Sequence, residues 1–113
     1  MPLKNLSYTE TEPGNRRFQL SNAYDMLPVN VIMPEDKEQM ALTINGKKRK
    51  FHKKEFKILA EVCDIPANAA EKMIEKLCVL ENKMLSLVDE SYLPQAQWDE
   101  LKTLIRDRVA ILL

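Results

Sequence analysis

The chain contains few of the residues that form the most recognisable functional sites. Its 113 residues include two glycines, Gly14 and Gly46. Neither lies in a G-x-G pattern, which excludes a glycine-rich phosphate-binding loop within this sequence. The two cysteines, Cys63 and Cys78, have no Cys-x-x-Cys spacing and fall in separate apolar helical patterns, which predicts buried free thiols and neither a disulfide nor a zinc site. The single histidine, His52, has no cysteine or carboxylate cluster around it, so we expect it to begin a helix and not to act in catalysis.

An excess of charge and a long apolar run are also missing. Seventeen basic residues balance seventeen acidic ones, so the formal net charge is zero. A polyanion would therefore have to bind a local basic patch, because the bulk charge offers no attraction. No apolar run approaches the length of a membrane span, and polar residues occur within the first five positions, unlike a signal peptide. We expect a single small cytoplasmic domain with no membrane partner.

Two stretches of alternating apolar and polar residues predict a β-hairpin near the N-terminus. They span residues 4–8 and 16–20, and Glu12-Pro13-Gly14-Asn15 between them supplies turn residues. Such a hairpin can bring Asn5, at its entrance, and Asp25, just past its exit, to the same end of the ribbon. Amide and carboxylate oxygens are ligands that suit Mg²⁺, so Asn5 and Asp25 are the candidate metal ligands.

A connector and a tight turn follow the hairpin. Pro28 and Pro34 each push the preceding residue out of helical geometry, so residues 26–36 are expected to be extended. Asn45-Gly46 is a strong signal for a type I′ turn, because both central positions of that turn need a positive φ. A second, short hairpin or a tight turn is expected there.

From His52 onward the apolar residues recur at helical spacing and predict three principal helices. Pro66 ends the first helix and opens a long second one, and Pro94 opens the third. The long second helix has a wide apolar stripe made of Ala70, Met73, Ile74, Leu77, Leu80, Met84, Leu87 and Val88. These stripes must be buried against one another or against a partner.

Together these elements define a mainly α (α+β) fold, with an N-terminal β-hairpin followed by three principal helices. We expect one domain over residues 1–113. Its parts are a hairpin and metal-ligand segment at 1–28, a connector and turn at 29–50, and a helical subdomain at 51–113.

Several motifs in this order resemble the HipA-like serine/threonine kinase toxins of toxin–antitoxin systems. Lys4-Asn5-Leu6-Ser7 resembles the run that closes the catalytic loop of that family. Residues 20–28 resemble its Tyr-Asp-aliphatic-aliphatic segment, which carries the second metal ligand. The likeness continues through residues 41–48 and 65–70. It covers about the first two thirds of the chain and implies the helical C-terminal lobe segment of such a kinase.

The resemblance implies transfer of the ATP γ-phosphoryl group to a protein serine or threonine, with Mg²⁺ held by Asn5 and Asp25. In kinases the catalytic-loop Asp precedes the metal-binding Asn by about five residues, which here falls before Met1. The expectation is therefore a C-terminal fragment that is inactive alone and binds Mg²⁺ and ATP weakly. The implied partners are a HipB-like antitoxin, operator DNA through that antitoxin, and the missing N-terminal kinase portion or a second copy.

Each candidate has a simpler alternative. Asn5 and Asp25 can instead form turns at the strand ends by bonding to nearby backbone N–H groups. The second candidate site is a basic run that is either a solvated turn and helix face or a surface that grips a nucleic-acid backbone. This run consists of Lys47, Lys48, Arg49, Lys50, Lys53, Lys54 and Lys57. For the whole chain, the alternative function is a non-enzymatic helical interaction module with vestigial kinase ancestry.

Overall fold

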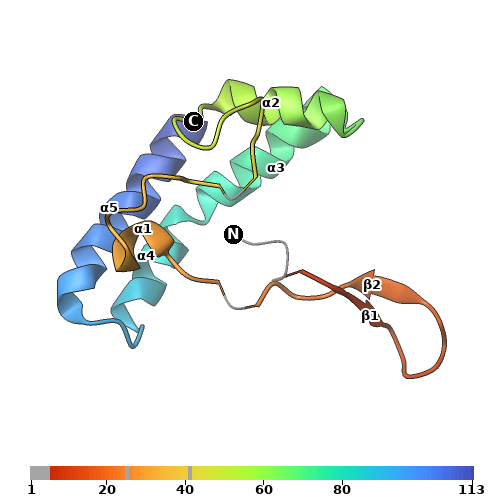
Figure 1. The fold of residues 1–113 in the computed structure, drawn as a ribbon, viewed down its shortest axis with the longest axis horizontal. Coiled ribbons are helices and arrows are strands. Elements are labelled where there is room, and N and C mark those ends of the chain that lie inside the picture. Colours follow the sequence, from red (N-terminus) through yellow and green to blue (C-terminus); the bar gives the residue numbers. More distant parts are fainter. Residues whose placement is uncertain (1–5, 25, 41) are drawn as a thin grey trace.

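Helices form most of the regular structure, and a two-stranded hairpin extends away from them (Figure 1). The computed structural model describes residues 6–24, 26–40 and 42–113. The elements in chain order are β1 (Tyr8–Glu10), β2 (Phe18–Leu20), α1 (Val29–Ile32), α2 (Lys53–Val62), α3 (Ala67–Val79), α4 (Glu81–Asp89) and α5 (Gln95–Leu112). The expected fold class, mainly α with an N-terminal hairpin, is confirmed.

The hairpin is antiparallel, with Tyr8 opposite Leu20 and Glu10 opposite Phe18. Residues that face each other in this way lie on the same side of the ribbon, so one face carries Tyr8, Phe18 and Leu20. These side chains are 76%, 64% and 62% exposed. Strand β1 begins at Tyr8, later than the expected start. After the strand, the Glu10 carboxylate closes a long loop by accepting hydrogen bonds from the backbone N–H groups of Gly14 and Arg16.

The connector is less extended than expected. Val29–Ile32 forms one turn of helix, α1, in which the backbone N–H groups of Val31 and Ile32 donate to the carbonyl of Pro28. The Asn30 amide then donates to the carbonyls of Asp36 (2.8 Å) and Glu38 (3.1 Å). These bonds fold the following loop back on α1.

The turn expected at Asn45-Gly46 is confirmed. Both residues have positive φ, 49° and 72°, and Ile44 and Lys47 form an antiparallel bridge across them. Ile44 is buried, and Lys47 of the turn donates a hydrogen bond to Glu55 of α2. The backbone N–H of Gln39 also donates to the carbonyl of Lys48 at 2.8 Å, which sets the loop before the turn beside the segment after it.

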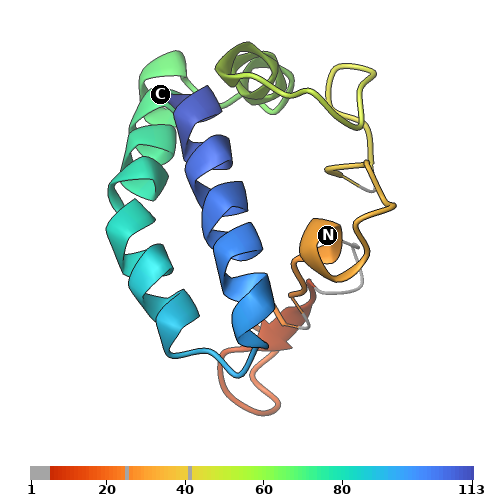
Figure 2. The ribbon, with the colours of Figure 1, turned by 90° about the vertical axis from the view of Figure 1, so that its left-hand side faces the viewer.

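The predicted long second helix is divided at Leu80. There the backbone (φ −79°, ψ −1°) stays in the right-handed helical region but departs from regular α-helical angles, and the Leu80 N–H bonds to the carbonyl of Leu77, three residues back. The helical pattern resumes when Met84 bonds to the carbonyl of Leu80 at 2.9 Å. Helices α3 and α4 therefore continue in nearly one line beside α5 (Figure 2).

The centre of the helical body is small. Ile74, Cys78 and Val109 form its buried cluster, and Phe56 and Leu112 pack against it. Phe51 is buried beside Phe56, with 6.0 Å between ring centroids.

The expectation of two buried thiols was half right. Cys78 is buried as expected, whereas Cys63 is exposed because it lies at the C-terminal end of α2, where the chain turns away. Both thiols are free. Among the described residues, no helix is both long and apolar enough to span a bilayer.

Candidate functional site

The two candidate metal ligands, Asn5 and Asp25, lie outside the described residues. The hairpin end next to them is described. The Ser21 backbone N–H donates to the Ser7 carbonyl at 2.7 Å, and the Ser7 N–H donates to the Ser21 hydroxyl at 3.2 Å. These bonds join the two sides of the hairpin at the open end of the ribbon. Ser7 is two residues after Asn5 in the sequence, and Ser21 is four residues before Asp25. In the described parts of the chain, no group of three or more His, Cys, Asp or Glu residues could hold a metal ion.

The structure divides the predicted basic run into two sets. Its helical lysines each lie within 4.0 Å of a carboxylate. Lys53 and Lys57 both bind Glu71 on α3, the latter at 3.1 Å. Hydrogen bonds from these lysines lower the pKa of the Glu71 carboxyl, and the bond to Glu71 raises the pKa of Lys53. Lys54 lies 4.0 Å from the Glu55 carboxylate.

The burial of Glu55 was not predicted from the sequence. Its side chain is fully buried. One carboxylate oxygen accepts a hydrogen bond from Lys47 Nζ at 2.7 Å, and the other accepts from the His52 backbone N–H at 2.7 Å. The bond to Lys47, together with the backbone bonds, lowers the pKa of Glu55 to about 2 despite the opposing effect of burial. Glu55 therefore fastens the Asn45-Gly46 turn to the first turn of α2.

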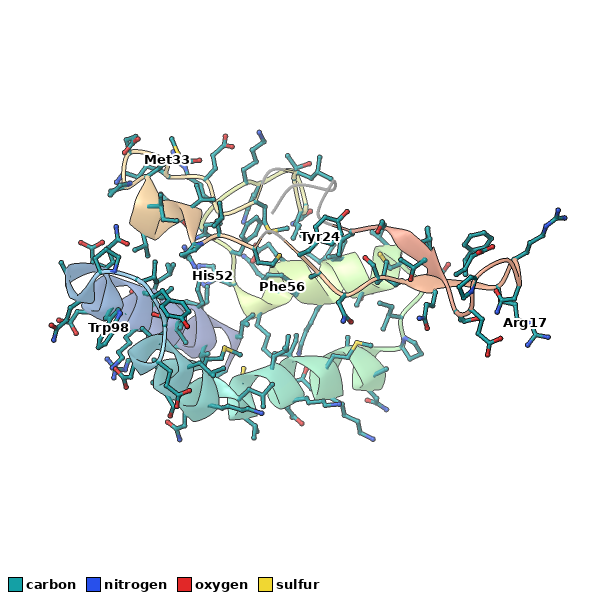
Figure 3. All side chains as sticks on the ribbon, turned by 90° about the horizontal axis from the view of Figure 1, so that it is seen from below. Arg17, Tyr24, Met33, His52, Phe56 and Trp98 are labelled. Atoms are coloured by element: carbon teal, nitrogen blue, oxygen red, sulfur yellow. The ribbon has the colours of Figure 1, made fainter. Side chains whose placement is uncertain are left out.

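His52 has the structural role that was expected of it. It is the residue that precedes α2, with extended backbone angles, and its N–H is capped by the Glu55 carboxylate. This bond satisfies the backbone N–H of His52 at the start of the helix. Figure 3 shows His52 and Phe56 within the helical body, far from the hairpin tip marked by Arg17.

The other cations of the run border a shallow groove of about 590 Å³, which we call the basic groove. It is lined by Lys37, Glu38, Lys47, Lys48, Arg49 and Lys50. Lys47 and Lys48 are paired with Glu55 and Glu38, the second at 3.4 Å. Over residues 6–24, 26–40 and 42–113, the exposed cations Lys37, Arg49 and Lys50 have no carboxylate partner. This groove can therefore attract an anion.

Lys37 was missed by sequence reasoning because it lies ten residues before the run. The signal was present in the Asn-Gly turn, since a tight turn brings the residues before it close to those after it. The hydrogen bond from Gln39 to Lys48 shows this pairing and carries Lys37 to the groove.

Comparison with known proteins gives one family match. The sequence model of the family described as HipA-like C-terminal domain matches residues 2–84. This range includes the hairpin, both candidate metal ligands, the basic groove, α2 and α3. No curated protein matches the chain.

Proposed function

Because the chain belongs to the HipA-like C-terminal domain family, we propose that it supplies the metal-binding end of a HipA-like serine/threonine kinase site. The observation that carries the proposal is the family match over residues 2–84, which spans Asn5 and Asp25 in the motifs that resemble the kinase ligands. The intact site would transfer the ATP γ-phosphoryl group to a protein hydroxyl.

The hairpin supports a shared location for Asn5 and Asp25. The bonds between Ser7 and Ser21 fix the open end of the ribbon. From there the chain reaches Asn5 within roughly 7 Å and Asp25 within roughly 14 Å, at about 3.5 Å per residue. One amide oxygen and one carboxylate at this end fit Mg²⁺, which leaves its other positions to water and nucleotide phosphates. When bound, that ion neutralises charge on the transferring phosphoryl group.

These 113 residues alone are proposed to be inactive. They contain no glycine-rich phosphate loop, and no kinase catalytic-loop Asp precedes Asn5 at the required spacing. Positioning and charge stabilisation supply most of the rate of phosphoryl transfer, so Asn5 and Asp25 by themselves are insufficient. Mg²⁺ and ATP should accordingly bind weakly to this polypeptide.

The exposed hairpin face is where the remaining kinase portion would dock. Tyr8, Phe18 and Leu20 present an apolar surface on this ribbon. A two-stranded ribbon is marginal in water without a covering layer. Covering this face would stabilise the ribbon and close the site at the same time.

The test is reconstitution. The 113-residue chain is mixed with a separately produced N-terminal portion of a HipA-like kinase that carries the catalytic Asp and the phosphate loop, and transfer of labelled γ-phosphate is followed. We expect transfer only from the mixture. Transfer by the chain alone, or none from a mixture shown by sedimentation to form a complex, would contradict the proposal.

The basic groove supports a second role, contact with operator DNA through a HipB-like antitoxin. The exposed cations Lys37, Arg49 and Lys50 are suited to hold phosphates, whereas the lysines of α2 are engaged with Glu55 and Glu71. Such contacts would position the protein on the DNA and would not read its sequence. A toxin acting within a cytoplasmic toxin–antitoxin complex would combine both roles.

A further inference from the structure

Helices α3 and α4 present an apolar stripe that the helical body leaves exposed. We call it the α3–α4 stripe, and it consists of Met73, Leu77, Leu80, Met84 and Leu87. Four of its members are exposed, Met73 by 58%, Leu77 by 54%, Leu80 by 39% and Leu87 by 55%. Their spacing alternates between four and three residues, which is the repeat that lets one helix pack along another.

This stripe is separate from the face that forms the core. Ala70, Ile74, Cys78 and Val88 on the same helices are buried, and Ile74 and Cys78 pack with Val109 of α5. The stripe lies next to this buried face on the helix surface. Most of its side chains therefore stay exposed, although they are large and apolar; Met84 is partly buried.

The division at Leu80 does not interrupt the stripe. Helix α4 begins at the next residue, and the two helices continue in nearly one line (Figure 2). Fourteen residues separate the first and last members, Met73 and Leu87, and a helix of that span is roughly 21 Å long. The stripe is long enough to seat about four turns of a partner helix.

A row of lysines follows one edge of the stripe. At 100° per residue, Lys76, Lys83 and Lys72 lie roughly 60° to 100° from the centre of the stripe, all on the side away from the buried face. All three are exposed. In the described part of the chain, none of them forms an ion pair. The acidic residue Glu75 lies about 160° from the centre of the stripe, beyond Lys72 and on the outer side of the lysine row.

From this juxtaposition we propose that the α3–α4 stripe docks an amphipathic helix of a protein partner, one with a leucine-type seam and acidic residues along one flank. The seam of the partner would cover the stripe, and its acidic flank would face Lys72, Lys76 and Lys83. Flanking charges of this kind set partner choice and orientation in helix pairs. This surface is distinct from the hairpin and from the basic groove.

A second copy of the chain fits this surface less well. Two copies packed antiparallel along their stripes would set one lysine row against the other, and like charges in that position repel. In a parallel pair, the lysine row of each copy would lie beside the buried face of the other copy, where that copy's own α5 is packed. The charge pattern therefore favours a partner of the opposite sign.

The test uses two synthetic helical peptides of 21 residues with the same leucine seam, one flanked by glutamates and one by lysines. Binding to the 113-residue chain is measured by fluorescence anisotropy. We expect the glutamate-flanked peptide to bind about tenfold tighter, a difference of about 1.4 kcal/mol. Lys76→Glu combined with Lys83→Glu should reverse the preference. Equal affinities, or no binding of either peptide, would overturn the proposal.

Two serine variants distinguish binding at the stripe from non-specific hydrophobic binding. Leu77→Ser with Leu87→Ser should weaken binding of the glutamate-flanked peptide about tenfold or more without changing helix content, because both side chains are exposed. The matched control is Val79→Ser, which changes a more exposed residue, at 81%, outside the stripe and should leave the affinity unchanged. Equal losses in the two variants would contradict the proposal.

Two further outcomes would also overturn it. Sedimentation could show a dimer that Leu77→Ser dissociates, which would make the stripe a contact between copies. Alternatively, peptide binding could disappear when the N-terminal kinase portion is added and phosphoryl transfer appears. That result would make the stripe an internal surface of the kinase while leaving the proposed function intact.

Discussion

The burial of Glu55 shows how a single carboxylate can organise a region of this chain. It accepts hydrogen bonds from Lys47 and from the His52 backbone, so one side chain connects the turn to the start of α2. A buried carboxylate without such partners would be protonated or would destabilise the fold. Glu55 instead remains ionised, with its pKa lowered to about 2.

The first prediction concerns stability in acid. The pKa of Glu55 is lower in the folded chain than its ordinary value of 4.5, so its ionised form favours folding above that value. This contribution should be lost as the pH falls from about 4.5 toward 2. In Glu55→Gln the free energy of unfolding at neutral pH should fall, and its dependence on pH in this window should flatten by about one proton. Urea unfolding at several pH values measures both effects.

Glu61→Gln is the matched control, because Glu61 lies on the same helix and is exposed. It should retain the parent pH profile. A Glu55→Gln profile that coincides with the parent would show that the carboxylate is not held as described. Glu71 will keep part of the acid sensitivity in both variants, since its pKa is also lowered.

The second prediction concerns Gly46. Its φ of +72° suits glycine, and a Cβ placed there would meet no atom within 4 Å. The cost of Gly46→Ala should therefore be the backbone strain alone, about 1 kcal/mol of the free energy of unfolding. Chemical denaturation measures this loss. An unchanged free energy would mean that the turn adopts another conformation in solution.

At the scale of elements, the turn and helix-start signals were read correctly, whereas the extended connector and the undivided second helix were wrong. The partners of each helix face were not predicted. The hairpin, the Asn-Gly turn and the helix starts at Pro66 and Pro94 depend on residues close in sequence, and each was predicted. The rotation of α2 was not predictable, because it depends on which residues of distant segments meet it. That rotation buries Glu55.

The basic run shows the same limit of prediction from sequence, because most of its ion-pair partners lie on other elements. Its sequence gives no sign that Glu71, on the next helix, binds Lys53 and Lys57, or that Lys37 joins the turn cations. Pairings between elements of this kind are fixed by the tertiary fold. The positions of Asn5 and Asp25 remain predictions from the motif that the chain shares with its family.

The third prediction concerns the basic groove and applies to the antitoxin-bound form on duplex DNA. A plot of the logarithm of the affinity against the logarithm of the salt concentration has a negative slope. Each phosphate contact that is removed should make this slope less steep by about 0.9. Arg49→Ala with Lys50→Ala should therefore weaken binding and flatten this slope. The measurement is a salt titration of the affinity, repeated with an unrelated DNA sequence, for which the loss should be the same.

Lys53→Ala with Lys57→Ala serves as the control for charge. It also removes two positive charges, but these lysines are bound to Glu71. We expect it to lower the stability of the contact between α2 and α3 and to leave the salt slope nearly unchanged. An effect on the slope equal to that of the turn variant would assign the DNA contact to the helix.

At the scale of the whole molecule, the chain combines a helical body with an exposed hairpin. The helices have their own buried centre at Ile74, Cys78 and Val109, whereas the apolar face of the hairpin is left uncovered. Asn5 and Asp25 lie outside the described residues, so their place beside this hairpin stays a prediction. The uncovered apolar face is available for contact with another protein surface.

The central claim, that Asp25 is a metal ligand of a kinase site shared between two polypeptides, is tested most directly by metal affinity in the reconstituted complex with ATP. Mn²⁺, as a substitute for Mg²⁺, allows the bound ion to be counted by electron paramagnetic resonance. Asp25→Asn keeps the size of the side chain and removes its charge, while Asp64→Asn changes an exposed aspartate between α2 and α3 and is the control. We predict that Asp25→Asn weakens Mn²⁺ binding by about tenfold or more and that Asp64→Asn leaves it unchanged. Equal Mn²⁺ affinity in the parent and Asp25→Asn complexes would contradict the account.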